Sequence, residues 1–457
     1  MASDYSPPHT WVTLTGAPIV TVSPVGKAQG YPVNNGADFG PDTPGTTTSG
    51  IQEALTSLST SGGTCRLLAG IFNVSTPITI IGDGIAVLGA GCTPFQPAPS
   101  GGTQISLMST FTAGDYLFLS DPTIHQSTFS NSGLKFADFS IECGGYGSGF
   151  NLVGVWGSIH ENVSVQNAHE NGFQILETGS AGGLNHLVAC STYVCAGSGF
   201  VINSAGGSLV SCYDYQSAVS FEIGATGSNY QWPVNLYGCW SDNASQAGFY
   251  IGSTTVGAAE GTLLTGCAVN LQTSTAVGVY LYSAQYAKFV NLSISGGSSV
   301  AMIQNPNVTN CDGVVFLNTQ FNVTGTTAYL YSGAAGSTTA KSVRFIGGSL
   351  QGAPTAQFNI QSGNPHIIVE NFSGINGQGF AITTPAVPTS GSGYTNTFPF
   401  AIRIYVLTAS GVTYTITDPS GNVGPSLSAS AGEEITLDPG AIITPTYTTL
   451  TWKFYGT

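Results

Sequence analysis

A short motif that ends in cysteine returns at nearly regular intervals, and it constrains the fold of this chain more than any other feature. Apolar runs end at Cys190, Cys212, Cys239 and Cys267, and successive cysteines are 22, 27 and 28 residues apart. The interval extends along the chain in both directions and predicts ten units of 22 to 29 residues. The equivalent position in these units is filled by Asp138, Asn162, Cys190, Cys212, Cys239, Cys267, Asn291, Asn318, Gly347 and Asn371.

A second marker follows the first by about ten residues in every unit. It consists of an apolar residue, any residue, and then Ile or Leu, as in FNL, FQI, FVI, FEI and FYI. The intervals between successive copies of the two markers lengthen and shorten together along the chain, which a chance pattern would not do. The third position of the motif is Leu152, Ile175, Ile202, Ile223, Ile251, Leu281, Ile303, Leu330, Ile360 and Ile382.

The pattern within each unit is typical of strands. Apolar and polar residues alternate over three to five positions, Gly or Asn interrupts the alternation, and helical spacing is absent. A strand this short cannot bury its apolar face alone, but turns of a coil stacked at roughly 4.8 Å can bury it together. The repeats therefore predict a parallel β-helix, whose ten turns would form a rod about 50 Å long.

Stacking explains why cysteine and asparagine share the repeated position. Asparagine can pass amide hydrogen bonds from one turn to the next, and cysteine is small and tolerates burial beside its own copies. We expect an internal stack of thiols rather than disulfides, because parallel Cβ vectors in one column disfavour the disulfide torsion. The chain has nine cysteines, an odd number, so at least one thiol is free or bonded between chains.

The segment before the repeats resembles the entry of the pectate-lyase-like right-handed β-helix superfamily, which includes many phage tailspikes. It supplies the D-F-G turn at Asp38–Gly40, the amphipathic helix with Ile51, Ala54, Leu55 and Leu58 on one face, and the strands at Gly62–Thr64 and Ala69–Phe72. Ser49 is the expected N-cap of that helix. The resemblance implies a right-handed coil. It does not extend to lyase chemistry, because the basic catalytic residues of pectate lyases have no recognisable counterpart here.

The C-terminal region has a different pattern. Residues 386–396 are rich in Pro, Gly, Ser and Thr, and alternating strands broken by SG, PSGN and DPG turns follow them. This region resembles the terminal modules of phage and virus appendage proteins, with Asn396, Phe398–Phe400 and Trp452–Tyr455 in the matching places. The sequence thus predicts an N-terminal arm at 1–36, a β-helix at 37–385 with a capping helix at 49–60, a linker at 386–396 and an antiparallel β-sandwich at 397–457.

Composition excludes several classes of partner. The eight Lys and Arg residues are scattered singly in a chain of net charge −14, so no basic surface is predicted for nucleic acid. No apolar run is long enough to span a membrane, the first residues lack a signal-peptide pattern, and no Cys or His spacing matches a zinc site. We expect no cofactor and no metal.

Three functions remain open. The first, which fits the capped rod and the terminal module, is a virion spike or fibre that binds a host surface carbohydrate, located on the virion or an extracellular surface. The second is a polysaccharide depolymerase, either hydrolase or lyase, on the same coil. The third is a purely structural filament or decoration protein. By resemblance to tailspikes we expect a homotrimer.

A depolymerase needs paired carboxylates, and acidic residues gather in one segment of this charge-poor chain. Three histidines, His160, His169 and His186, accompany them. Solvated turn residues on consecutive coils would give the same pattern. The catalytic candidates are Glu142, Glu161, Glu170, Glu177, Asp214 and Glu222.

The binding candidates come from the middle position of the second marker. If its first and third positions point inward, strand alternation turns the middle residue outward. That column is Asn151, Gln174, Val201, Glu222, Tyr250, Tyr280, Met302, Tyr329, Asn359 and Ala381. Tyrosine rings can pack on sugars, and the amides and the acid can bond their hydroxyls. We expect Gln174, Glu222, Tyr250, Tyr280 and Tyr329 to bind carbohydrate, although packing of tyrosines on each other or on another subunit would also explain the column.

Overall fold

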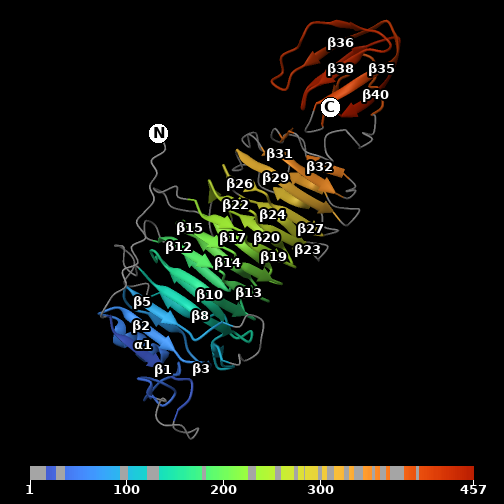
Figure 1. The fold of residues 1–457 in the computed structure, drawn as a ribbon. Helices are drawn as coiled ribbons and strands as arrows, with labels where there is room; N and C mark the ends of the chain where they lie inside the picture. The colour runs from blue at the N-terminus through green and yellow to red at the C-terminus, as the bar shows by residue number, and fades with distance from the viewer. Residues whose placement is uncertain are drawn as a thin grey trace.

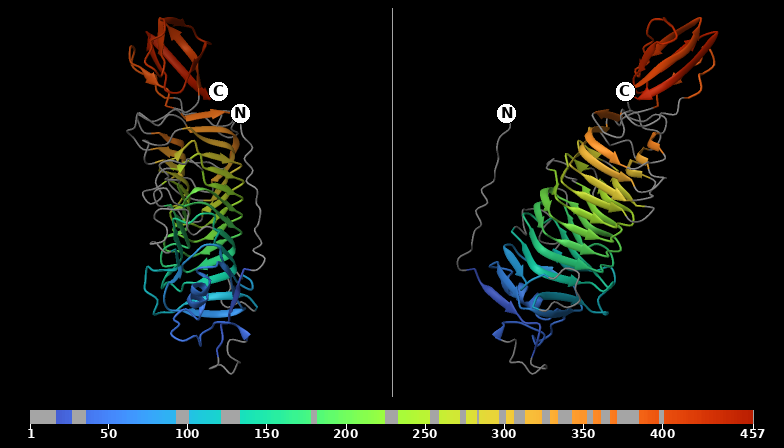
Figure 2. Two further views of the ribbon diagram at one scale, coloured as in Figure 1. Left: turned by 90° about the vertical axis from the view of Figure 1, so that its left-hand side faces the viewer. Right: turned by 45° about the vertical axis from the view of Figure 1, so that its right-hand side comes forward.

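The protein is a single-stranded right-handed parallel β-helix with a helix at one end and a small antiparallel sandwich at the other (Figure 1). The rod is elongated from every side (Figure 2). The predicted fold class is therefore confirmed. The computed structural model describes residues 17–26, 36–92, 101–120, 133–177, 182–224, 233–252, 259–271, 276–282, 284–296, 301–305, 313–323, 329–333, 343–351, 356–360, 367–370, 385–397 and 401–456.

Each full turn of the coil places strands on three faces, which we number in chain order. The first face contains β1 (Ile19–Val22), β2 (Gly63–Leu67), β5 (Ile85–Leu88), β12 (Gly183–Val188), β15 (Ala205–Val210), β18 (Asn235–Tyr237), β22 (Leu263–Thr265), β26 (Lys288–Val290) and β33 (Ile367–Glu370). The second face contains β3 (Gly70–Val74), β6 (Thr103–Leu107), β13 (Ser191–Tyr193), β16 (Tyr213–Tyr215), β19 (Trp240–Asp242), β23 (Ala268–Leu271) and β27 (Ser293–Gly296).

Four longer strands pass around the corner between these faces and join them into one 20-stranded sheet: β8 (Lys135–Glu142), β10 (Ile159–Gln166), β29 (Val314–Val323) and β31 (Val343–Gln351). The third face is an 11-stranded sheet of β4 (Ile78–Ile80), β7 (Tyr116–Ser120), β9 (Ser148–Val153), β11 (Phe173–Leu176), β14 (Ser198–Asn203), β17 (Val219–Gly224), β20 (Ala247–Ile251), β24 (Val277–Leu281), β28 (Ala301–Asn305), β30 (Tyr329–Gly333) and β32 (Ala356–Ile360). Two short strands, β21 (Ala259–Glu260) and β25 (Ala284–Gln285), pair between the third and first faces.

The core of the third face contains a column of phenylalanines, one from each of six successive turns, whose rings stack with centroids 5.0 to 5.2 Å apart. These rings belong to Phe118, Phe150, Phe173, Phe200, Phe221 and Phe249. All are fully buried. Full burial of one such side chain contributes about 1.5–3 kcal/mol, and ring stacking adds about 0.5–1.5 kcal/mol. The first position of the second sequence marker is thus the main internal stack of this face.

The first corner, between the first and second faces, has a length of two residues in every turn from β12 to β27, and it corrects the first predicted register by one residue. Because Glu161 pairs with Val188 and Ser164 with Ser191, Asn162 lies opposite Ala189, and Val163 opposite Cys190. The asparagine and cysteine positions are therefore neighbouring columns rather than one. The first has left-handed backbone at Asp138, Asn162, Ala189, Ser211, Gly238, Gly266, Asn291, Asn318 and Gly347. Asn and Gly adopt that conformation most readily, which explains their recurrence.

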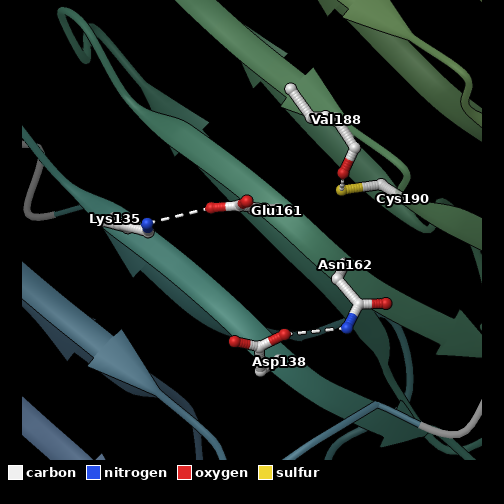
Figure 3. Close-up of polar contacts among 6 residues, drawn as sticks. All are labelled: Lys135, Asp138, Glu161, Asn162, Val188 and Cys190. Carbon is white, nitrogen blue, oxygen red and sulfur yellow. Dashed lines mark hydrogen bonds and ion pairs between the residues drawn. The ribbon is translucent and has the colours of Figure 1, made fainter.

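Both columns use hydrogen bonds between successive turns. Asn162 donates its amide to Asp138 Oδ1 at 2.8 Å (Figure 3), and Asn318 donates to Asn291 Oδ1 at 2.7 Å. In the cysteine column, Cys212 Sγ donates to the Leu187 carbonyl of the preceding turn at 3.5 Å, and Cys190 bonds Val188 O within its own turn (Figure 3). The four stacked cysteines are buried free thiols, so the predicted internal stack is confirmed.

The second register follows the prediction as far as Tyr280, departs from it at Met302 and Tyr329, and returns to it at Asn359, which pairs with Ser332. Tyr280 pairs with Gln304, and Gln304 pairs with Ser332, so neither Met302 nor Tyr329 belongs to the outward column. Tyr329 pairs with Ala301 instead. The predicted inclusion of Tyr329 in the binding column is therefore wrong. The remaining members expected near the C-terminal end of the coil, Ala381 and Ile382, lie outside the described residues, as does Asn371 of the first register.

Helix α1 (Ile51–Leu58) closes the first end of the coil. Ile51, Ala54, Leu55 and Leu58 are buried on one face, as their spacing predicts. The residue before the helix is Gly50, and Ser49 turns away to donate to the Asn73 carbonyl at 2.7 Å. Ser49 is therefore not the N-cap. Thr48 Oγ1 accepts the Gln52 amide at 3.1 Å and thereby satisfies one of the free N–H groups of the first turn.

The sandwich packs a four-stranded sheet against a three-stranded one. The strands are β34 (Tyr394–Thr395), β35 (Ile402–Ser410), β36 (Val412–Thr417), β37 (Leu427–Ala429), β38 (Glu434–Leu437), β39 (Ile442–Thr446) and β40 (Thr449–Gly456). Residues 386–396, predicted as a linker, supply β34, and Trp452 Nε1 donates to the Pro385 carbonyl at 3.0 Å. Tyr394 packs on Phe454 with ring centroids 5.1 Å apart. Phe398, Pro399 and Phe400 lie outside the described residues.

Candidate functional site

The outward side of the third face has one column of half-buried polar and aromatic side chains, which we call the outer column. Parallel pairing aligns its members in consecutive turns: Asn151, Gln174, Val201, Glu222, Tyr250 and Tyr280. Val201 is buried, with 1% of its surface exposed, and the other five are partly exposed. The alternation therefore positions four of the five predicted binding residues on one surface.

A polar cluster forms one end of the outer column. The hydroxyl oxygen of Tyr116, on β7, lies 3.2 Å from both Glu170 Oε2 and Gln174 Oε1 and can donate its proton to either. Asn171 donates its amide to the Tyr116 oxygen at 2.9 Å and to Gln174 Oε1 at 2.8 Å. Gln174 in turn donates to Asn151 Oδ1 at 3.1 Å. Burial is the main cause that raises the pKa of Tyr116, so its phenol stays protonated and keeps a donor in this cluster.

A second set of bonds extends the cluster toward Glu222. Asn171 Oδ1 accepts the backbone amide of Ser198 at 2.8 Å, and the Ser198 hydroxyl donates to Glu222 Oε2 at 3.0 Å. The two acids Glu170 and Glu222 are thus both attached to one network that spans several turns. Such cross-turn bonds fix the side-chain positions before any ligand arrives, which lowers the entropy cost of binding.

Tyrosine rings continue the outer column beyond Glu222. The Tyr250 and Tyr280 rings have centroids 4.5 Å apart and planes inclined by 38°. Tyr282 lies 6.1 Å from Tyr250 by the same measure and widens the aromatic surface. Burial, followed by the neighbouring phenols and Glu222, raises the pKa of Tyr250 to about 12. The Tyr250 hydroxyl is therefore a neutral donor and acceptor at physiological pH.

The two acids of this network, Glu170 and Glu222, attach to it at points that are two turns of the coil apart. Gln174 and Glu222 are separated by one intervening residue, Val201, which corresponds to two strand spacings, or about 10 Å. The Glu170 carboxylate bonds at the Gln174 end of that interval. Catalytic carboxylates are about 5–5.5 Å apart in retaining glycosidases and about 6.5–9.5 Å apart in inverting ones. The backbone spacing is close to the inverting range, and both carboxylates can also accept hydroxyl groups of a sugar chain.

The other predicted acids are dispersed over the coil. Glu161 pairs with Lys135 at 2.9 Å on the first face (Figure 3), and both side chains are partly exposed. Glu142 accepts the Gly144 backbone amide and the Asn167 side-chain amide, each at 2.8 Å. Neither belongs to the outer column. These two residues fit the expectation for solvated turn residues better than a catalytic role.

Asp214 lies inside the coil with none of its surface exposed, so a polysaccharide cannot reach it. The hydroxyls of Thr192, Ser217 and Ser220 donate to its carboxylate at 2.6, 2.5 and 2.6 Å. Burial raises the pKa of Asp214 to about 6, and the hydroxyl bonds oppose that rise. We therefore exclude Asp214 from the candidate catalytic residues, because its position between two outward tyrosines turns it inward.

His160 is also a core residue. It is fully buried, its ring stacks on Phe136 with centroids 5.0 Å apart, and burial lowers its pKa to about 3. Its ring is therefore neutral, and Nδ1 has no hydrogen-bond partner among the described residues. His186 is instead bound to Ser208 Oγ at 2.9 Å on the first face. His160 and His186 thus do not join the acids in a common site, whereas His169 is exposed and directly precedes Glu170.

Glu177 is a partly exposed acid with a raised pKa. It follows β11 directly, its Oε2 atom has no hydrogen-bond partner among the described residues, and burial raises its pKa to about 7. A carboxyl group in this state can hold a proton near neutral pH, which is the requirement for a general acid. Among the described residues no group of three or more His, Cys, Asp or Glu side chains is arranged to hold a metal ion.

The sequence reading did not single out a second aromatic surface. Tyr193, Tyr213, Tyr215 and Trp240 point outward from the second face, together with Asp242. The sequence indicates these outward residues by the triplets Y-D-Y and W-S-D, which directly follow Cys212 and Cys239. In each triplet the middle residue points inward, and the aromatic or acidic residue on either side of it points outward.

No protein-family model and no curated protein matches the chain. Among solved structures, the chain is similar to a surface adhesin of Streptococcus pneumoniae, with 10% identity, a TM-score of 0.49, and coverage of 77% of this chain and 91% of the adhesin. It is also similar to the A-module of the mannuronan C-5 epimerase AlgE6 of Azotobacter vinelandii, with 14% identity, a TM-score of 0.46, and coverage of 71% and 94%.

A third similar structure is the tailspike protein gp49 of the Acinetobacter baumannii bacteriophage Fri1, a capsular polysaccharide depolymerase. The identity is 13%, the TM-score is 0.45, and the match covers 89% of this chain and 81% of the tailspike. At such identities and TM-scores these likenesses carry no argument about activity, so the function of this chain rests on its own residues. No helix in the described part of the chain is long and apolar enough to cross a membrane.

Proposed function

We propose that the protein is a spike or fibre component of a virion that binds a host surface polysaccharide along the outer column. The observation that carries the binding proposal is the continuous surface from the Tyr116 cluster through Glu222 to the paired rings of Tyr250 and Tyr280. Except at the turn of the buried Val201, its groups are one strand spacing apart along the rod, so a sugar chain lying parallel to the axis would meet a new polar or aromatic side chain at the other turns.

The chemistry of the column suits sugars. Tyrosine presents a rigid, flat apolar face with a hydroxyl at its edge, and this combination packs on the C–H face of a pyranose while bonding its hydroxyls. Carboxylates and amides held by neighbouring side chains accept and donate further hydrogen bonds. Aromatic anchors of this kind contribute about 1–2 kcal/mol each when truncated, which corresponds to about 5- to 30-fold in Kd.

The test is a binding measurement on a panel of purified bacterial capsular and cell-wall polysaccharides by surface plasmon resonance and calorimetry. We expect the double variant Tyr250→Ala/Tyr280→Ala to weaken binding to the recognised polysaccharide by about 30-fold or more. Tyr405→Ala is the matched control, because Tyr405 is an exposed tyrosine of the sandwich. Unchanged affinity in a folded, assembled double variant would exclude the outer column as the binding face.

A depolymerase is the second candidate, and it is favoured by Glu177, whose Oε2 atom has no hydrogen-bond partner among the described residues and whose pKa is raised to about 7 by burial. Hydrolysis would release reducing ends, and β-elimination would produce an unsaturated product that absorbs ultraviolet light. We expect Glu177→Gln to abolish turnover and leave binding intact if this function holds. Stable binding without any product from the wild-type protein would reject the enzyme and retain the adhesive spike.

A homotrimer is the assembly that we propose for this spike. Parallel coils leave strand edges and aromatic side chains on their surfaces, and symmetric association covers such features. Light scattering of the full chain is expected to give three times the mass of 46.7 kDa. A monomer across a wide concentration range would refute the trimer, and a rod without affinity for any glycan would favour the purely structural role.

A further inference from the structure

The second face of the coil contains an aromatic surface that the proposed binding column does not use. We call it the Trp240 patch and define it as Tyr193, Tyr213, Tyr215, Trp240, Asp242 and Asn270. Parallel pairing places these residues in two adjacent columns. Tyr213 precedes Trp240 in one, and Tyr193, Tyr215, Asp242 and Asn270 follow one another in the other.

Trp240 is the most exposed member of the patch, with 47% of its surface accessible. The Tyr213 ring lies 5.5 Å from it between centroids, at an interplanar angle of 77°. This perpendicular arrangement fixes the indole and leaves part of its surface open to solvent. Beside it, Tyr193 and Tyr215 stack with centroids 4.9 Å apart and planes within 8°. The patch is therefore a pre-arranged aromatic surface rather than a set of separate side chains.

Asp242 supplies a fixed hydrogen-bonding group beside the indole. The Tyr213 hydroxyl donates to Asp242 Oδ2 at 3.2 Å, and the Asn270 amide donates to Oδ1 at 2.9 Å. Burial, followed by the charge of Asp242, raises the pKa of Tyr213, so the phenol remains a donor in this pair. Each carboxylate oxygen has further lone pairs, and a carboxylate held in this way can accept hydroxyl groups from a ligand.

The charge around the patch restricts the class of ligand. Strands β13, β16, β19, β23 and β27 contain no Lys or Arg, and Asp242 is their only outward acid. An anionic sugar would therefore find no cation on these strands and would be repelled by Asp242. A neutral pyranose, which needs an apolar platform and a hydroxyl acceptor, matches both features.

The composition of the same face argues against a subunit contact. The positions that pair with the patch in the next turns are Ala268, Ser293 and Ser295, which are small or polar. The exposed aromatic surface is therefore confined to a few side chains. A stable interface between chains needs about 800 Å² from each partner and an apolar centre. The small and polar residues that follow the Trp240 patch along this face do not continue such an apolar centre.

We propose that the Trp240 patch is a second saccharide-binding site that takes a neutral pyranose unit of a polysaccharide, with Trp240 as the stacking platform and Asp242 as the hydroxyl acceptor. This site lies on a different face from the outer column and does not depend on it. Two sites on adjoining faces would allow one rod to hold two sugar chains, or two segments of one chain, and so raise avidity without new contacts.

Affinity electrophoresis of the full chain tests the proposal, with gels that contain dextran, yeast mannan or a neutral galactan as probes and hyaluronate as the anionic comparison. We expect retardation on at least one neutral probe and none on hyaluronate. Trp240→Ala should lower the affinity about tenfold or more, Trp240→Phe should lower it less, and Asp242→Asn should weaken it with the platform intact. Tyr286→Ala is the matched control, because Tyr286 is an exposed tyrosine outside the patch.

The double variant Tyr250→Ala/Tyr280→Ala separates this site from the outer column. It should leave binding to the neutral probe unchanged, and Trp240→Ala should leave binding at the outer column unchanged. The proposal is overturned if no neutral probe retards the wild type, or if Trp240→Ala binds as the wild type does. It is also overturned if Trp240→Ala instead lowers the oligomeric mass in light scattering, because the patch would then be a contact between copies of the chain.

Discussion

Replacement of Asp214 by Asn tests the account of the interior most directly. The carboxylate is fully buried and accepts hydrogen bonds from the hydroxyls of Thr192, Ser217 and Ser220, and no cation pairs with it in the described part of the chain. Asn has nearly the same shape but cannot ionise. Its amide oxygen can accept the Thr192 and Ser217 hydroxyls that bond Oδ1, and its NH2 group would donate to Ser220 in place of the bond that Ser220 donates to Oδ2. The substitution therefore removes a titration and leaves the packing almost unchanged.

The sign and size of the effect follow from the pKa of Asp214, which burial raises from 3.8 to about 6. The folded protein therefore holds this proton more tightly than the unfolded chain. The resulting stabilisation is complete below pH 3.8 and is lost as the pH rises through about 6. At about 1.4 kcal/mol for each pKa unit, ionisation of Asp214 costs the folded state about 3 kcal/mol at pH 7.

The assay is denaturant unfolding of the wild type and Asp214→Asn between pH 4 and pH 7.5. The free energy of unfolding of the variant, relative to that of the wild type, should rise by about 2–3 kcal/mol over this range, because other titrating groups cancel in the difference. Asp438→Asn, at an exposed position in the sandwich, is the control and should give no such trend. A difference that stays constant with pH would refute the argument from burial.

Two further predictions concern the same interior. His160→Phe should raise the free energy of unfolding by about 1–3 kcal/mol at pH 7, because it removes a buried polar atom and continues the stack on Phe136. The wild type should lose stability as the pH falls below 6.5, because the pKa of His160 is lowered to about 3 in the folded state, and the variant should lack this loss. Equal acid sensitivity in both proteins would count against this. Gly199→Ala should destabilise the protein by about 1–3 kcal/mol in thermal or denaturant unfolding, because the added Cβ would overlap the Asp214 carboxylate and the Thr192 hydroxyl. A variant as stable as the wild type would show that this part of the coil can relax.

The sequence predicted the period, the strand content and the helix cap because these follow from local alternation and spacing. It misplaced the first register by one residue because the left-handed corner position accepts residues as different as Asn162 and Ala189, while the cysteines occupy the next position. Only the pairing of whole strands distinguishes the two columns. The second register failed at Met302 and Tyr329 because the motif also occurs as AMI and AYL, two and three residues before the triplets that align in the structure.

The candidate site was predicted only in part. Alternation placed Gln174, Glu222, Tyr250 and Tyr280 correctly, because the middle residue of each marker points outward. Tyr116 was missed because it is 58 residues from Gln174 in the sequence, and only the coiling of the chain brings their side chains together. Asp214 was included as an acid, although its place between two outward tyrosines already assigns it to the interior.

The corners of the coil differ in how they tolerate change. Two residues always connect the first and second faces from β12 to β23, as in Ala189–Cys190 and Gly238–Cys239. The connection from the third face back to the first instead contains one residue, Ser204, between β14 and β15, and ten residues, 225–234, between β17 and β18. Segments of new length and composition can therefore be grafted at that edge without shifting any strand pair. The rod is a scaffold on which recognition loops can be exchanged while its ladder stays the same, by natural variation or by design.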